Sequence, residues 1–273
     1  MARCSVTLEF LSASERRSAC TMTSRLALGL SYRGTAYHGW QRQTDGRTVQ
    51  DAVERALSTF VGAPITTVCA GRTDAGVHAF NQVVHIDSPV QRDAFSWQRG
   101  VNRYLPKDIA LQWCRAVPAD FHARYQAHGR RYRYLLLASP VRPALETGHA
   151  GWVFRQVDAD TMRAAAAHLL GEHDFSSFRA SDCQARSPVK TMRDIRIQAH
   201  GAYWRIDFDG SAFLHHMVRN IMGCLVAVGI GRHPPGWLAD VLAARHRDAA
   251  APTFSADGLY FAGPYYDAAL GLP

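Results

Sequence analysis

The sequence lacks several features that would assign it to a particular class of protein. It has no apolar stretch long enough to span a bilayer, and its runs LLLA at 135–138 and LVAVGI at 225–230 have the length of core segments. Its six cysteines form no CxxC pair, which argues against a disulfide framework or a zinc knuckle and favours reduced cytoplasmic thiols. No P-loop, no GxGxxG and no metal-ligand cluster is found, so nothing indicates a nucleotide cofactor or a metal.

What is present is a basic, globular composition. The chain has 273 residues, of which 47% are hydrophobic and 20% charged, enough for one large domain or two closely packed ones. Its net charge of +8 suits a polyanionic partner and equally suits a solvated basic surface. The run GRRYRY at 129–134 interleaves arginine with tyrosine, and this clustering favours nucleic acid.

The first residues differ from the rest of the chain. They contain no long apolar core behind a basic start, so they make a poor signal peptide. A clean strand pattern begins only after Met22. We expect residues 1–24 to be a disordered leader or the product of an upstream start-codon artefact.

Hydrophobic periodicity predicts alternating strands and helices. Residues 26–32 alternate with period two, as in a half-buried strand, and Thr48 begins a helical pattern that ends before Gly62. The remaining predicted strands are 65–70, 80–87, 109–117, 131–138, 191–199, 203–209 and 258–265. The remaining predicted helices are 92–104, 159–170, 212–228 and a short one after Pro235.

This order of elements predicts an α+β fold with mostly antiparallel strands. Residues 139–157 change pattern and contain prolines and glycines, so we expect them to connect two halves of the fold. The first half would then be 25–138 and the second 158–273. The hairpin turn of the second half is expected at His200–Ala202.

The run GRTDAGVHAF at 71–80 falls in the predicted loop between two strands. Its two glycines permit tight turns, and its arginine and aspartate could face a cleft from a loop. An isolated RTD is more often a turn in which the aspartate caps the backbone and the arginine is a surface charge. The whole ten-residue run is much more specific than that.

AGRTDAGVHA at 70–79 resembles the signature of the tRNA pseudouridine synthase A family. The resemblance extends from about Arg25 to near the C-terminus and rests on several further segments. These are LSYRGTAYHGWQRQ at 30–43, FHARYQAHGRRYRY at 121–134, FSSFRASDCQARSPVKTMRDI at 175–195, FLHHMVRNIMGCL at 213–225 and GLYF at 258–261.

The resemblance implies an enzyme that isomerises uridine to pseudouridine at positions 38, 39 and 40 of the tRNA anticodon stem-loop. It implies a fold of two similar halves, each a mostly antiparallel sheet with helices on one side, meeting over a basic catalytic cleft. It also implies that no cofactor is needed, because the reaction is an isomerisation without redox change. A homodimer that binds tRNA is implied in the same way.

The resemblance also assigns roles to four residues. Asp74 would be the nucleophile, attacking either C6 of the uracil or C1′ of the ribose. Arg219 would be its ion-pair partner, although the helical pattern equally allows an exposed charge there. Arg72 would help to flip the uridine out of its stack, and Tyr132 would stack on the flipped base and help to remove its C5 proton. Tyr132 could instead be a core residue of its strand, because it shares a face with Tyr134.

Further basic residues have less specific predicted roles. Candidates for phosphate contacts are Arg33, Arg124, Arg130 and Arg131, each of which could also be a generic surface charge. His215 and His216 fall within the predicted helix 212–228, where adjacent side chains diverge by about 100°, so we predict no metal site there.

Two alternatives to this function stay open. One is a non-catalytic RNA-binding protein of the same fold, which would be free to replace Asp74. The other is a synthase that acts on other uridines or other RNAs, since target choice depends on the shape of the cleft and of the RNA.

Overall fold

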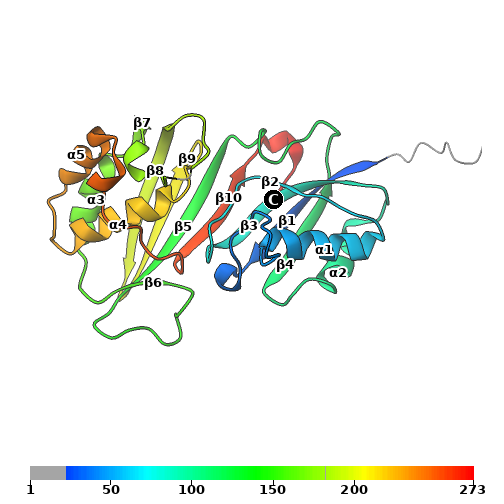
Figure 1. Cartoon of the computed structure of the whole chain (residues 1–273), viewed down its shortest axis with the longest axis horizontal. Helices are drawn as coiled ribbons and strands as arrows, with labels where there is room; N and C mark the ends of the chain where they lie inside the picture. Colours follow the sequence, from blue (N-terminus) through cyan, green and yellow to red (C-terminus); the bar gives the residue numbers. More distant parts are fainter. Residues whose placement is uncertain (1–22, 182) are drawn as a thin grey trace, which may run out of the picture.

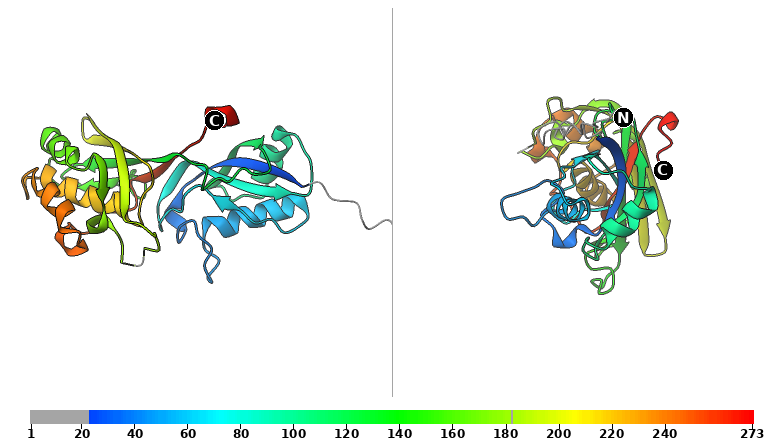
Figure 2. Two further views of the ribbon diagram at one scale, coloured as in Figure 1. Left: turned by 90° about the horizontal axis from the view of Figure 1, so that it is seen from above. Right: turned by 90° about the vertical axis from the view of Figure 1, so that its right-hand side faces the viewer.

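The structure is a computed structural model that describes residues 23–181 and 183–273. Residues 1–22 of the predicted leader lie outside the described residues, and the first strand already begins at Ser24, inside the range predicted as leader. One twisted sheet runs along the long axis of the molecule, with α1 and α2 at one end and α3, α4 and α5 at the other (Figure 1). The view from above in Figure 2 shows the two ends joined by the strands between them.

The described residues form ten strands and five α-helices. The strands are β1 (Ser24–Tyr32), β2 (Val68–Cys69), β3 (His78–Ser88), β4 (Ile109–Ala116), β5 (Gly129–Ala138), β6 (Gly151–Val153), β7 (Gly171–Asp174), β8 (Val189–His200), β9 (Tyr203–Gly210) and β10 (Leu259–Tyr265). The helices are α1 (Val49–Val61), α2 (Ala94–Asn102), α3 (Ala159–Ala167), α4 (Met217–Gly229) and α5 (Trp237–Ala244).

Strand β10 joins the two parts of the sheet. The strand order is β4-β1-β3-β10-β5-β9-β8-β7, with β2 beside β3 and β6 beside β5. Pairing is antiparallel except between β10 and β3 and between β5 and β6. The last strand of the chain therefore lies between two strands from the first half of the sequence. The predicted α+β class is confirmed, and the two half-sheets are continuous through β10.

Local signals explain the ends of several elements. The Thr48 hydroxyl accepts a hydrogen bond from the backbone N–H of Asp51 at 3.3 Å, which caps α1 as predicted. Gly62 ends the helix with φ of 79°, a conformation that favours glycine. Gly201, with φ of 64°, forms the predicted turn between β8 and β9.

Several predicted bounds were wrong. The predicted strand 65–70 is reduced to β2, because the chain turns away from the sheet into the loop that carries Asp74. The helix predicted over 212–228 begins only at Met217, because His216 adopts a left-handed backbone with φ of 60° that a helix cannot contain.

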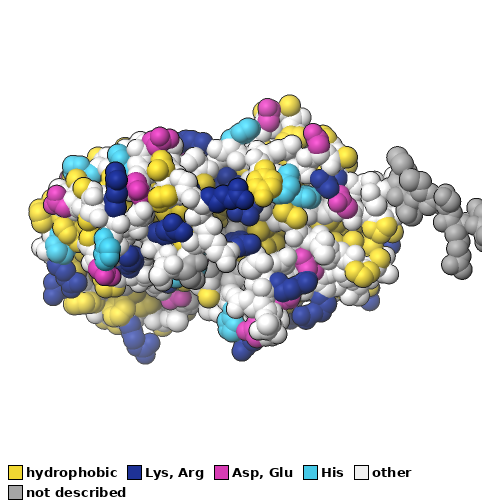
Figure 3. All heavy atoms as spheres, turned by 45° about the horizontal axis from the view of Figure 1, so that its top comes forward, with side chains coloured by type: hydrophobic (Ala, Val, Ile, Leu, Met, Phe, Trp, Pro, Cys, Tyr) yellow, Lys and Arg dark blue, Asp and Glu magenta, His cyan; other side chains and the backbone are white. Residues whose placement is uncertain are grey.

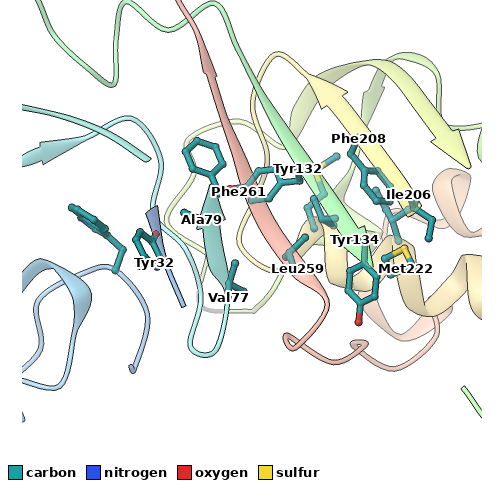
Figure 4. Packing of buried hydrophobic residues seen from close by; sticks show 14 of the residues in the cluster. Tyr32, Val77, Ala79, Tyr132, Tyr134, Ile206, Phe208, Met222, Leu259 and Phe261 are labelled. Atoms are coloured by element: carbon teal, nitrogen blue, oxygen red, sulfur yellow. The ribbon is translucent and has the colours of Figure 1, made fainter. Parts of the chain in front are cut away.

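The main hydrophobic core extends across both parts of the sheet, and a smaller cluster forms around Ala27, Phe121 and Ala123. Tyr132 and Phe261 are neighbours at the centre of the main core, with ring centroids 5.1 Å apart, and Leu259 and Tyr134 continue the row (Figure 4). Tyr134 is fully buried and donates a hydrogen bond to the Ser255 carbonyl, and Tyr132, 8% exposed, belongs to the same core. None of the helices among the described residues combines the length and apolarity that crossing a bilayer requires.

Candidate active site

The loop between β2 and β3 is fixed by its buried neighbours. Thr73 is buried, and its hydroxyl lies 2.8 Å from the Tyr32 hydroxyl while its carbonyl accepts from Trp40 N–H at 3.0 Å. Gly76, with φ of 79°, closes the turn, and the N–H of Val77 donates to the Asp74 carbonyl. These contacts on both sides of Asp74 set the position of its side chain.

The Asp74 carboxylate faces three basic side chains, one from the first turn of α4 and two from the residues just before it. The Arg219 Nη1 atom lies 3.4 Å from Asp74 Oδ2. The Nε2 atoms of His215 and His216 lie 3.4 Å from Oδ1 and 3.6 Å from Oδ2. The carboxylate is only 15% exposed, and the permanent charge of Arg219 offsets part of the cost of removing its charge from water.

This geometry contradicts the reading of Asp74 as a turn cap. Its carboxylate instead accepts a side-chain hydrogen bond from Arg219 Nη1 at 3.4 Å. Arg219 is itself held in place, because its Nε donates to the Phe254 carbonyl at 2.9 Å and its side chain is 17% exposed. The reading of Arg219 as an exposed helix charge is therefore wrong.

Tyr132 lies on the same side of the sheet as this cluster. It is 8% exposed, and its ring meets the edge of Phe213 with centroids 5.0 Å apart. Burial, together with the negative charge of Asp74, raises the pKa of the Tyr132 phenol well above its ordinary value. The phenol is therefore protonated at neutral pH and close enough to Asp74 to feel its charge.

Arg72 is exposed beside the site and contacts neither Asp74 nor any other acidic group of the described residues. Burial raises the pKa of the neighbouring Cys69 thiol to about 11, and the charges of Arg72 and Arg124 act in the opposite direction. Both guanidinium groups therefore lie near this thiol. Figure 3 shows Lys and Arg side chains across the middle of one face of the molecule, among hydrophobic and histidine side chains.

The other arginines are not equivalent. Arg130 donates to four backbone carbonyls, so its guanidinium stabilises the fold and is a poor candidate for phosphate. Arg131 is on the opposite face of β5 from Tyr132, where it lies 4.3 Å over the Tyr265 ring. Arg33 is exposed and lines a separate cavity of about 600 Å³ with Lys107 and His149.

The sequence did not predict where the side chains of His215 and His216 lie. The argument from diverging helical side chains was wrong, because both precede α4 and their rings lie 4.1 Å apart. With Asp74 they present ligand atoms within 4.8 Å of one another, a set that could hold a metal ion. Histidine is one of the residues enriched in the left-handed conformation, but too few histidines adopt it for the sequence alone to predict the turn at His216.

The fold places one largely buried carboxylate against basic side chains and close to an aromatic ring, and this combination defines the site. A sequence profile described as tRNA pseudouridine synthase matches residues 30–126 and 165–267. The chain belongs to the tRNA pseudouridine synthase family.

Individual relatives agree with this assignment. The chain is 69% identical to tRNA pseudouridine synthase A of Methylibium petroleiphilum, with 91% of this chain and 96% of the relative covered. It is 62% identical to the protein of the same name from Polaromonas naphthalenivorans, with the same coverage. Among solved structures, a Cbf5-Nop10-Gar1 complex is similar over 86% of this chain and 48% of that one, with a TM-score of 0.38 and 11% identity.

Proposed function

We propose that the protein isomerises uridine to pseudouridine at positions 38, 39 and 40 of the tRNA anticodon stem-loop, with Asp74 as nucleophile. The observation that carries this proposal is the Asp74 carboxylate, 15% exposed and set against Arg219 at 3.4 Å. The chain that presents it is 69% identical to a tRNA pseudouridine synthase A. A carboxylate that is shielded from water and paired with a guanidinium has few competing hydrogen-bond partners, so it can act as a nucleophile.

The reaction breaks the bond between C1′ and N1 and makes a bond between C1′ and C5. In one route an Asp74 oxygen bonds to C1′ as N1 leaves with the bonding pair; the base turns, and C5 then displaces the carboxylate. In the other route the carboxylate adds to C6 and the C5–C6 π electrons move onto O4 as an enolate; after C1′ has moved from N1 to C5, C5 loses its proton and the carboxylate is eliminated as the C5–C6 double bond re-forms. In both, C5 loses a proton and N1 gains one, so the product is an isomer and no cofactor is required.

The neighbouring residues have separate tasks in this proposal. Arg219 holds the carboxylate and balances its charge. Tyr132 stacks on the flipped uracil; since its pKa is raised, it contributes a neutral phenol and does not rest as the phenolate that would accept the C5 proton. Arg72, exposed and without an acidic partner among the described residues, contacts the RNA where the uridine leaves its stack.

Product mapping tests the proposal and its alternatives. Unmodified tRNA carrying uridine at 38, 39 and 40 is incubated with the protein, and pseudouridine is located by chemical probing. We expect product at these three positions and none when they are replaced by cytidine. Product confined to other uridines would favour a synthase with a different target, and tRNA binding without product would favour the non-catalytic reading.

We also propose that the active species is a cytoplasmic homodimer in which one tRNA contacts both subunits. The resemblance of the sequence segments to the family supports this. Light scattering of the protein with and without tRNA tests it: the expected mass is that of two chains, and a mass of one chain in both states would contradict it.

A further inference from the structure

The turn between β4 and β5 carries an unusually exposed aromatic side chain. Tyr125 is 76% exposed, the highest value for any tyrosine, phenylalanine or tryptophan in the described part of the chain. A single exposed aromatic ring is ordinary by itself, so its surroundings decide whether it has a role. None of the roles proposed above for the active-site residues involves Tyr125.

The exposed ring is nevertheless held in one orientation. The His122 ring stacks on it, with centroids 4.2 Å apart and planes inclined by 25°. His122 Nδ1 accepts hydrogen bonds from the backbone N–H groups of Arg124 and Tyr125, both at 3.2 Å. On the inner side, His85 accepts from the N–H of Ala123 at 3.1 Å. One face of the tyrosine is thus supported by the protein.

The same turn is tied to the loop that carries the nucleophile. Arg130 donates through Nη2 to the carbonyl of Arg124 at 2.6 Å and to the carbonyl of Ala70 at 3.1 Å. Ala70 immediately precedes the segment that contains Arg72 and Asp74. A partly buried guanidinium that bridges two backbone carbonyls fixes the two segments side by side, so the Tyr125 ring keeps its place relative to the site.

The charge around the ring is positive. The Arg124 guanidinium carbon lies 5.8 Å from the centroid of the Tyr125 ring. Arg72 and Arg124 are both exposed, and both act on the Cys69 thiol at the end of β2, so two cations lie near the start of the catalytic loop. An aromatic face beside arginine side chains is the combination that binds unpaired nucleotides, because the base stacks and the phosphate meets the cation.

We propose that Tyr125 is a stacking platform for an unpaired base of the RNA, distinct from the pocket of the reacting uridine, with Arg124 on the adjoining phosphate. This inference rests on the proposed function, since it takes RNA as the substrate. It adds a second point of base contact, which orients the RNA strand before the uridine is flipped.

Binding measurements with matched variants test the platform. In the Asp74→Asn background, which removes chemistry, the dissociation constant for unmodified tRNA is measured for Tyr125→Ala, Tyr125→Phe and Phe95→Ala. Phe95 is the matched control, because it is 63% exposed and has Arg99 at 5.4 Å but belongs to α2. Loss of one stacked base weakens binding about 5- to 150-fold.

We expect Tyr125→Ala to show that loss, and Tyr125→Phe and Phe95→Ala to bind within twofold of the parent. Equal binding by Tyr125→Ala, or an equal loss in Tyr125→Phe, would overturn the stacking role. A fully paired RNA duplex of two separate strands serves as the second probe, and its binding is expected to be unaffected by Tyr125→Ala. A similar loss with that duplex would overturn the preference for unpaired bases.

Two further outcomes separate this proposal from others. If Tyr125→Ala changes the mass of the RNA-free protein by light scattering, the ring contacts a second copy of the chain and the platform is refuted. If the unmutated protein makes no pseudouridine but its tRNA binding still depends on the Tyr125 ring, the proposed function fails while the platform stands.

Discussion

Asp74 and Arg219 are 145 residues apart in the chain, yet their charged atoms lie 3.4 Å from each other in the seam between the two parts of the sheet. The pair joins the loop after β2 to the first turn of α4, and Arg219 is held from behind by the Phe254 carbonyl. Its value for catalysis lies in this fixed geometry, because a carboxylate that must be desolvated needs a partner already in place.

Replacing Arg219 by lysine should therefore lower turnover severely. Lysine keeps the charge but cannot donate to Phe254 and Asp74 at once through a planar fork. We expect kcat to fall by about 100-fold, the size usual for loss of one preorganised donor, with a small change in tRNA affinity. Thermal unfolding of the variant is the control for folding, and turnover within threefold of the parent would show that the pair is dispensable.

Replacing Tyr132 by phenylalanine removes the hydroxyl and keeps the ring. Because the phenol is protonated and buried, its loss costs one hydrogen bond near the reacting base, so we expect turnover to fall about tenfold while tRNA binding holds. Tyr132→Leu, which removes the ring as well, should lose more turnover. A collapse of binding in Tyr132→Phe would make the residue an anchor or a structural tyrosine.

Divalent metal ions offer a test of the cluster around Asp74. Zn²⁺ accepts histidine and carboxylate ligands at the spacing found between Asp74, His215 and His216. The nucleophile needs a free oxygen, so we expect EDTA to leave the rate unchanged and added Zn²⁺ to inhibit, less so in His216→Ala. Activity that is lost in EDTA and restored by Zn²⁺ would instead make the metal a cofactor.

The pH dependence of stability should report on His85. Burial, with the charge of Arg25 also acting, lowers the pKa of His85 from 6.5 to about 4. The unfolded chain then binds a proton between these two values that the folded chain does not. Stability is thus unaffected above pH 6.5 and falls as the pH drops toward 4, by about 3 kcal/mol in total.

Urea unfolding across this range measures that loss. The variant His85→Gln keeps an acceptor for the N–H of Ala123 but does not titrate, so its stability should depend less on pH. An unchanged slope in the variant would show that other groups cause the effect. The measurement also bears on the Tyr125 turn, since His85 supports its inner side.

The sequence predicted what local patterns determine. The strand at 26–32, the Thr48 cap and the loop around Asp74 follow from periodicity, capping and glycine placement over a few residues. The place of β10 between β3 and β5 depends on pairing with strands more than a hundred residues away, which no local pattern encodes.

The site shows the same division. Of the four residues to which the resemblance assigned roles, Asp74, Arg219 and Tyr132 lie close together in the structure. Arg72 lies apart from them at the surface. Arg130 looked like a phosphate ligand because its sequence context is basic, but its carbonyl partners come from distant segments. The approach of His215 and His216 to Asp74 depends on one unusual backbone conformation.

The most direct measurement compares the protein with its Asp74→Asn variant on unmodified tRNA under single-turnover conditions. The substitution keeps the size of the side chain and removes its negative charge. Pseudouridine at positions 38 to 40 is expected with the parent and none with the variant, which should still bind tRNA. Equal amounts of product from both proteins would contradict the role of Asp74 as nucleophile.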